Sequence, residues 1–167
     1  MIACCENIKH KSIICLLYGC GLRVSEVINL KIKDIDSKAN VIYIIAGKGK
    51  KDRIVMLDKQ LLELLRKYYT EYKPKEYLFN GQFDLQYSTR SINEFLKQIA
   101  IKAGVTGNIH AHLLRHSFAT HSLEQGIDIS YIQKLLGHNS IKTTLIYTHV
   151  SKSTIANIPS PLSHISI

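Results

Sequence analysis

Six residues of this sequence have side chains that together could act on a phosphodiester. They are Arg23, Lys48, His112, Arg115, His138 and Tyr147, in the strings GLRVSE, GKGKKDR, HLLRH, LLGH and IYTH. The five nitrogen-bearing side chains could hold a phosphate group and neutralise the charge that develops on it. The phenol oxygen of the sixth could then attack the phosphorus. This is the chemistry needed to transfer a DNA strand without a metal ion.

The composition is compatible with that chemistry. A length of 167 residues fits one domain with a hydrophobic core, and a hydrophobic content of 46% argues against disorder. Lysine and arginine number 22 against 13 acidic residues, and the net charge of +9 favours a polyanionic partner, usually nucleic acid. A guanidinium matches a phosphate better than an ammonium group does, so the few arginines carry more weight. The arginines are Arg23, Arg53, Arg66, Arg90 and Arg115.

Arg23 follows Gly21 in a turn that leads into a helix predicted from about Val24 to Leu30. The free backbone amides at a helix start attract anions, and a neighbouring guanidinium adds a planar fork for phosphate. Alternatively, Arg23 is a surface residue that pairs with Glu26, three positions later on the same helix. The spacing alone leaves both interpretations open.

The string GKGKKDR places Lys48, Lys50 and Lys51 in a glycine-rich turn between two predicted strands, residues 41–45 and 53–57. Glycines allow such a turn to approach a DNA backbone closely, although an ordinary solvated turn has the same composition. The string differs from a phosphate-binding P-loop in its glycine spacing. It also joins two strands rather than a strand and a helix.

His112 and Arg115 are three positions apart, so they share one face at the start of a helix predicted over residues 113–125. Together they could contact adjacent oxygens of one phosphate. A histidine that caps the helix or packs in the core would show the same spacing. His116 and His121 fall elsewhere on this helix and are expected to be structural.

His138 follows Gly137, which ends a short helix predicted over residues 128–136. Its imidazole could reach a phosphate or could cap the carbonyl groups at the helix end. Tyr147 is expected on a last helix that Ser140 caps. Taken by itself, Tyr147 is one of nine tyrosines and is better explained as a core residue than as a nucleophile.

The remaining pattern predicts a mainly α-helical domain with a small antiparallel β-hairpin sheet. Further helices are expected at residues 7–18, at 61–69 after the capping residue Asp58, and from Ser88 or Ser91 to Ala103. The segment 73–90 is predicted to be loop-rich, with a short extended stretch at 77–79. Residues 1–150 are expected to form this one domain, and the proline-containing tail 151–167 to be loosely held.

Two alternatives rest on the histidines and on residues 117–137. His110, His112, His116 and His121 are close in sequence, but no cysteine lies nearby and no HExxH motif occurs, so no metal and no cofactor are predicted. Residues 117–137 could form a helix-turn-helix. Their second helix, ISYIQKLL, is mainly apolar and offers few groups for base edges, so a packing helix is predicted.

The N-terminal region bears on the compartment. All four cysteines lie within the first 20 residues without CxxC spacing, which indicates a reducing cytoplasm, with Cys15 and Cys20 packing as small apolar residues. The run IICLLYGC after Lys11 resembles a short lipoprotein signal, but it is short and contains the bulky Tyr18. A buried helix explains it better. Since no segment reaches the roughly 20 apolar residues of a membrane span, no membrane association is predicted.

Taken together, the strings GLRVSE, GKGKK, HLLRH, LLGH and YTH resemble the catalytic domain of the tyrosine recombinases, the phage-integrase family, and most closely its Xer-type members. They occur in the family order across residues 13–150, and the nine-residue step from His138 to Tyr147 matches the family spacing. The resemblance implies the tyrosine recombinase catalytic-domain fold. It also implies site-specific DNA recombination or integration through a covalent 3′-phosphotyrosine.

The resemblance implies a role for each of the six residues. Arg23 and Arg115 would clamp the scissile phosphate, and His138 would donate a hydrogen bond to it. Lys48 would protonate the leaving 5′-oxygen. His112 would act as a general acid/base near the tyrosine, and Tyr147 would become the phosphotyrosine. A tyrosine with a pKa of about 10 is a poor nucleophile at neutral pH, so nearby cations and a base must activate it.

The resemblance also implies partners. The substrate would be double-stranded DNA, contacted by Lys48, Lys50, Lys51 and Arg53 of the hairpin, and copies of the chain would associate on DNA as a tetrameric synapse. The family's N-terminal DNA-binding domain is expected to be absent, and the tail 151–167 is a candidate protomer-docking segment. Two alternatives stay open: a nicking-closing activity like that of type IB topoisomerases, and a non-catalytic DNA-binding remnant of a recombinase.

Overall fold

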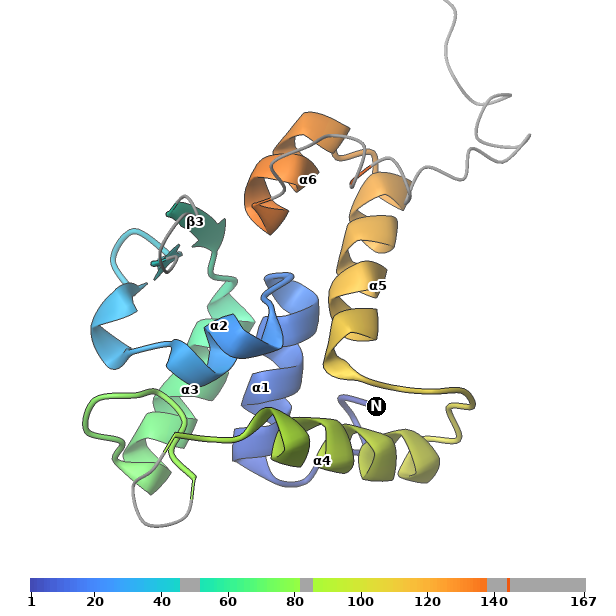
Figure 1. Cartoon of the computed structure of the whole chain (residues 1–167). Coiled ribbons are helices and arrows are strands. Elements are labelled where there is room, and N and C mark those ends of the chain that lie inside the picture. Colours follow the sequence, from blue (N-terminus) through green and yellow to red (C-terminus); the bar gives the residue numbers. More distant parts are fainter. Residues whose placement is uncertain (46–51, 82–85, 138–143, 145–167) are drawn as a thin grey trace, which may run out of the picture.

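The computed structural model describes residues 1–45, 52–81, 86–137 and Thr144. Its helices surround a central one and cover one small sheet (Figure 1). The helices are α1 (Ile8–Gly19), α2 (Val24–Asn29), α3 (Lys59–Tyr72), α4 (Thr89–Lys102), α5 (Ala111–Glu124) and α6 (Ile129–Leu136), with the short 3-10 helix η1 (Ile32–Asp34). The strands are β1 (Ile35–Asp36), β2 (Val41–Ile44) and β3 (Arg53–Met56).

Helix α1 lies at the centre of the hydrophobic core. Its residues Ile13, Ile14, Leu16 and Leu17 are fully buried, and it packs against α2, α3, α4 and α5. Apolar residues on several faces of one helix are typical of a helix enclosed on all sides. The run that resembles a signal sequence is therefore a core helix, as the sequence predicted. None of the helices in the described part of the chain is long and apolar enough to cross a membrane.

The sheet contains the predicted hairpin and one further strand. Strands β1, β2 and β3 are antiparallel in that order, and Ile44 of β2 pairs with Arg53 of β3. Ile42, Ile44 and Val55 are buried, whereas the alternate residues face outward, because successive side chains of a strand point to opposite faces. Residues 46–51, with Lys48, Lys50 and Lys51, join β2 to β3 and lie outside the described residues.

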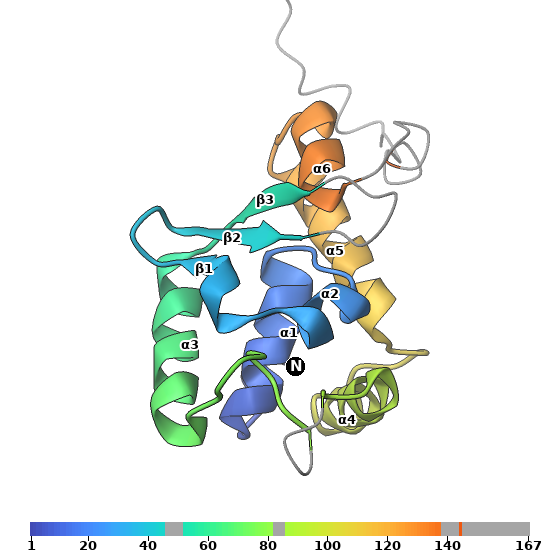
Figure 2. The ribbon, with the colours of Figure 1, turned by 60° about the vertical axis from the view of Figure 1, so that its left-hand side comes forward.

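Helices α5 and α6 pack against each other beside α1 and β3 (Figures 1 and 2). Phe118 and Ala119 of α5 meet Ile132 and Leu136 of α6 in a small cluster of buried side chains. Helix α6 is therefore a packing helix, as predicted. Gly137 adopts a left-handed conformation with φ of 61° at its C-terminus, where a glycine is strongly favoured.

The predicted capping residues explain where several helices begin. The Asp58 side chain accepts hydrogen bonds from the backbone amides of Gln60 and Leu61, and the Ser88 hydroxyl accepts one from Ser91. Helix α5 begins at Ala111, two residues before the predicted start, so its first turn includes His112. The predicted last helix with Tyr147 lies outside the described residues.

Candidate catalytic site

Three arginines meet at one corner of the fold, where four elements converge. Arg23 is the residue before α2, Arg53 is the first residue of β3, and Arg115 lies in the second turn of α5. All three donate hydrogen bonds to the carboxyl end of α6. Their local structure explains this convergence, because each one stands at or near the start of its element.

Glu26 of α2 lies at the centre of this group. Its Oε1 accepts hydrogen bonds from Nη1 of Arg23 at 2.9 Å and from Nη1 of Arg53 at 2.8 Å. Its Oε2 accepts one from Nη2 of Arg53 at 2.7 Å and one from the Arg23 backbone amide at 2.7 Å. Nη1 of Arg115 lies 3.9 Å from the same Oε2. One carboxylate thus faces all three guanidinium groups.

The surroundings of Glu26 keep it ionised. Burial alone would raise the pKa of this carboxyl group, because it disfavours the charged form. The hydrogen bonds from Arg53 and Arg23, with the positive charge of Arg53, outweigh burial and lower the pKa from its ordinary value of 4.5 to about 2. Glu26 is therefore a fixed negative charge at physiological pH.

The last carbonyl groups of α6 hold the other side of the three arginines. Leu135 O accepts from Nε of Arg53 at 2.6 Å, and Leu136 O accepts from Nη2 of Arg115 at 2.5 Å. The next carbonyl, that of Gly137, accepts from Nη2 of Arg23 at 3.4 Å. The final carbonyls of a helix lack partners within the helix and carry its negative dipole end, so cations are favoured there.

The three arginines differ in their access to solvent. The side chain of Arg23 is 32% exposed, that of Arg53 is 8% exposed and that of Arg115 is 2% exposed. Arg115 is anchored further by a 2.6 Å hydrogen bond from its Nη1 to the carbonyl of Gly21. Arg23 and Arg115 lie side by side, since they share Glu26 and adjacent carbonyls of α6. Arg23 forms the open edge of the pair.

His112 lies on the first turn of α5, one turn before Arg115, and is exposed. Its pKa is lowered from 6.5, first by partial desolvation and then by the positive charge of Arg115, with smaller contributions from His110, His116 and Arg23. The ring of His110 stacks at 6.4 Å from that of His112. The imidazole of His112 is therefore neutral at neutral pH and can accept a proton.

The structure shows the surroundings of two predicted residues. Arg53 is predicted to contact DNA, and in the structure its guanidinium faces inward and binds Glu26 and the carbonyl of Leu135. This fold buries it because the base of the hairpin packs against α6. The alternative pairing of Arg23 with Glu26 does form, yet Arg23 also lies beside Arg115, so the pair is part of the site.

Other predicted residues lie outside the described part of the chain. Lys48, His138 and Tyr147 are among them. Residues 46–51 lie between Ile45 and Asp52 in sequence, and His138 directly follows Gly137. The arginine group is therefore flanked in sequence by the segments that carry Lys48 and His138.

The sequence pattern indicates Glu26 only as a surface partner of Arg23, whereas the structure places its carboxylate among three guanidinium groups. Arg23 is the N-cap of the short helix α2, and Glu26 is the third residue after it. A glutamate at this position often accepts a hydrogen bond from the backbone amide of the N-cap residue, as Glu26 does from Arg23. That signal could have indicated a fixed carboxylate, although not its contact with Arg53.

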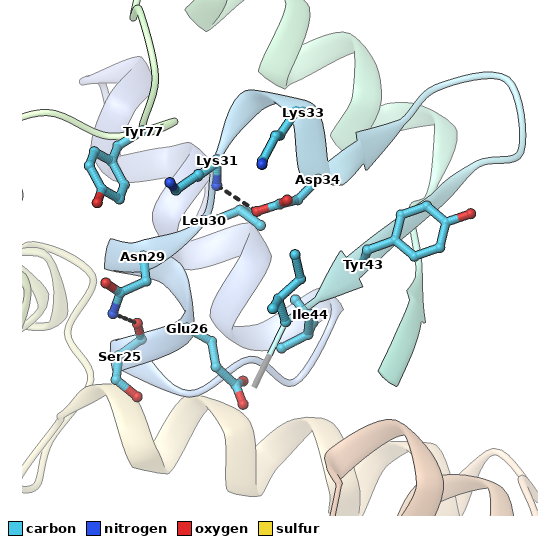
Figure 3. Close-up of a pocket in the computed structure, with 11 residues that line it drawn as sticks. Ser25, Glu26, Asn29, Leu30, Lys31, Lys33, Asp34, Tyr43, Ile44 and Tyr77 are labelled. Carbon is cyan, nitrogen blue, oxygen red and sulfur yellow. Dashed lines mark hydrogen bonds between the residues drawn. The ribbon is translucent and has the colours of Figure 1, made fainter. Parts of the chain in front are cut away.

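A pocket lies beside α2 between η1 and the sheet (Figure 3). Figure 3 shows Glu26 projecting from α2 on the side away from Lys31 and Asp34. The ammonium group of Lys31 binds Glu76 at 2.7 Å, and its backbone amide binds Asp34 at 3.0 Å. The pocket adjoins the arginine group through Glu26. Within the described residues, no three histidine, cysteine or acidic side chains are grouped to hold a metal ion.

Solved structures identify the class to which this fold belongs. The crystal structure of XerA recombinase superposes with a TM-score of 0.85 at 33% identity, covering 99% of this chain and 62% of that chain. The XerH site-specific recombinase, bound to difH substrate in a pre-cleavage complex, superposes with a TM-score of 0.80 at 31% identity, covering 93% of this chain and 48% of that chain. The predicted fold, that of a tyrosine recombinase catalytic domain, is confirmed.

The sequence comparisons then give the family. Residues 1–154 match the model of the phage integrase family, and the chain belongs to that family. It is 42% identical over 147 residues to a tyrosine recombinase of Pseudothermotoga lettingae, covering 87% of this chain and 51% of that protein. It is 45% identical over 147 residues to the tyrosine recombinase XerA of Thermococcus kodakarensis, covering 86% and 51%. The chain spans about half the length of these curated relatives.

Proposed function

We propose that this chain is the catalytic part of a site-specific tyrosine recombinase, which cuts and rejoins double-stranded DNA through a covalent 3′-phosphotyrosine. The observation that carries the proposal is the pairing of Arg23 and Arg115. Glu26 and the end of α6 hold their guanidinium groups side by side, one helical turn from a neutral His112. Residues 1–150 would be the catalytic domain.

The arginine pair would bind the scissile phosphate and stabilise its transition state. Each guanidinium offers a planar set of donors to phosphate oxygens, and donors already fixed by protein contacts need no rearrangement as negative charge develops. Glu26 and the α6 carbonyls supply that fixation. All these partners are acceptors, so they orient the guanidinium groups by occupying some of their N–H donors.

The remaining residues would move protons and form the covalent bond. Tyr147 would attack the phosphorus while His112 takes its proton. The bond from phosphorus to the 5′-oxygen would break, and Lys48 would protonate that oxygen. The new ester with Tyr147 conserves the phosphodiester, so attack by a 5′-hydroxyl reverses the step and rejoins the strand without ATP. His138 would donate a hydrogen bond to a phosphoryl oxygen.

The relatives support recombination over the nicking-closing alternative, since they are named tyrosine recombinases. The XerH structure is a complex with its difH substrate, which supports DNA as the partner here. We further propose that several copies assemble on DNA, with residues 151–167 as a candidate docking segment. We also propose that the protein acts in the cytoplasm, the reducing compartment that its clustered cysteines without CxxC spacing indicate.

A covalent-trapping experiment tests the proposal without a known target site. The protein is incubated with a pool of labelled duplexes that carry randomised sequence and a single nick, so that the short cleaved fragment diffuses away and prevents rejoining. DNA that stays attached to protein after denaturation is recovered and sequenced. Wild-type protein should yield adducts with a common sequence. Recovery no greater than that of Tyr147→Phe would refute the proposal.

A further inference from the structure

We infer that Arg53 is a positioning residue that locks β3, Glu26 and the end of α6 into one arrangement and thereby sets the geometry of the Arg23–Arg115 pair. The inference rests on the proposed function for the meaning of that geometry. It replaces the expectation that Arg53 binds DNA.

All three nitrogen atoms of the Arg53 guanidinium bind protein acceptors. Nε donates to the carbonyl of Leu135 at 2.6 Å, while Nη1 and Nη2 donate to the two oxygens of Glu26 at 2.8 and 2.7 Å. The two parallel bonds form a bidentate pair, which is the strong and directional form of an arginine–carboxylate contact. With side chains 8% and 14% exposed, this ion pair is shielded from water.

Arg53 joins elements that are far apart in sequence. It is 27 residues from Glu26 and 82 residues from Leu135. Through Glu26 it acts on Arg23, whose guanidinium binds the same Oε1. Through Leu135 it fixes the carbonyl that precedes the acceptor of Arg115, Leu136. Both members of the arginine pair therefore depend on partners that Arg53 holds.

Gly137 makes room for this arrangement. A Cβ atom added there would lie 3.0 Å from Cδ of Arg53 and 3.4 Å from its Nε and Nη1. The aliphatic and guanidinium parts of Arg53 thus lie close against the backbone at the end of α6. The end of α6 and the start of β3 are in contact at this point, so a shift of either would move the other.

The chemistry of the site requires arginine rather than any cation. A lysine has one ammonium group on a flexible stem and cannot reproduce a planar fork that meets a carboxylate and a carbonyl together. Replacement by lysine would keep the charge but leave at least one buried acceptor without its donor. Arg53→Lys therefore isolates geometry from charge.

Single-turnover cleavage of a nicked duplex recovered from the covalent-trapping pool tests the inference. Arg53→Lys should slow cleavage at saturating DNA by on the order of 10²-fold, the effect of a displacement of about 1 Å in an active site. Its dissociation constant for DNA and the salt dependence of that constant should match the wild type. Arg66→Lys is the matched control, because Arg66 is exposed on α3, and it should cleave like the wild type. Assays are run below the unfolding temperature of each variant.

Titration of Glu26 by NMR gives a second readout that needs no DNA. The carboxyl group should remain ionised in wild-type protein through the range in which ordinary glutamates titrate, since Arg53 helps to hold its pKa near 2. The pKa should rise in Arg53→Lys and rise further in Arg53→Gln. A loss of packing elsewhere in the fold would not produce this order.

The outcomes separate the inference from the proposed function. Unchanged cleavage in Arg53→Lys, or weaker DNA binding with a shallower salt dependence, would overturn the positioning role, and the second result would restore a DNA contact. If wild-type protein forms no adduct, the proposed function fails. The Glu26 titration then decides alone, and an unchanged pKa in both variants would overturn the inference.

Discussion

The buried guanidinium of Arg115 donates a 2.6 Å hydrogen bond to the carbonyl of Gly21, a residue 94 positions earlier in the chain. This bond ties the turn before Arg23 to the helix that carries Arg115. Gly21 has a φ of +61°, and a Cβ there would lie 2.5 Å from Cδ1 of Phe118. Both the backbone angle and this close approach require glycine, so the site depends on a residue that has no side chain.

Replacing Gly21 by alanine should destabilise the protein by roughly 2–6 kcal/mol, the sum of a strained left-handed backbone and an overpacked contact. Urea unfolding followed by circular dichroism measures this loss. Gly104→Ala is the matched control, because Gly104 has a similar φ of +67° but nothing within 4 Å of its Cβ position. Equal losses for the two variants would show that contact with Phe118 contributes nothing.

Glu26→Gln should lower the free energy of unfolding at neutral pH. It should also make that free energy depend less on pH in the acid range. The folded-state pKa of Glu26 is about 2 against an ordinary 4.5, so its contribution is complete above pH 4.5 and is lost as pH falls toward 2. The difference corresponds to about 3 kcal/mol at 1.36 kcal/mol for each unit of pKa. Urea unfolding between neutral pH and about pH 3 should show the two curves converging.

Glu76→Gln is the control for this comparison. Glu76 also binds a cation, Lys31, but the pair is exposed to solvent, and exposed ion pairs contribute little to stability. Its removal should leave the dependence of stability on pH close to that of the wild type. A constant offset between wild type and Glu26→Gln at every pH would contradict the ionised Glu26 that the three arginines surround.

The helices and the hairpin could be predicted because their signals are local. Asp58 and Ser88 bind amides within three residues, and Gly137 ends α6 by its own backbone conformation. Strand β1 could not be predicted, since two residues form a strand only when a partner is present, here Val41 and Ile42 of β2. Such a pairing has no periodicity for a sequence pattern to reveal.

The candidate site was predicted in part. Arg23 and Arg115 were singled out from their local strings, and the structure brings them together. The inward orientation of Arg53 was missed, because it depends on Glu26 and Leu135, which are distant in sequence. A basic residue near a lysine-rich turn gives no local sign that it will be buried. The predicted roles of Lys48, His138 and Tyr147 stay predictions.

Cleavage should depend on pH through His112. A general base must be neutral, so the rate should rise with pH through the pKa of His112 and level off, and that pKa should lie below 6.5 because of desolvation and the charge of Arg115. Single-turnover rates between about pH 5 and 8 measure the profile. His112→Ala should lose this acid limb, whereas His121→Ala should keep it, since His121 binds Tyr18 instead. An acid limb that survives in His112→Ala would assign it to another group.

DNA binding should be dominated by backbone contacts and should weaken steeply with salt. The net charge of +9 favours contacts with phosphates, which release counterions on binding. Affinity for a duplex of mixed sequence should fall sharply between about 50 and 200 mM salt. Lys50→Ala should reduce the salt slope by about one, as expected for a phosphate contact. A slope unchanged in Lys50→Ala and Lys51→Ala would remove these lysines from the DNA interface.

Arg115 and Lys48 should be distinguishable by the leaving group of the substrate. Arg115→Ala should impair cleavage more than Lys48→Ala, because a phosphate-binding arginine acts in every step, whereas a general acid contributes about 10²–10⁴-fold. A duplex with sulfur in place of the 5′-bridging oxygen releases a thiolate that needs no proton. It should therefore restore cleavage by Lys48→Ala and leave Arg115→Ala inactive.

Since Arg115 is buried, Arg115→Lys is assayed as well, with circular dichroism confirming that each variant is folded. Rescue of both variants, or of neither, would show that Lys48 is not the general acid, and the same substrate applied to Lys50→Ala and Lys51→Ala would then identify which lysine is.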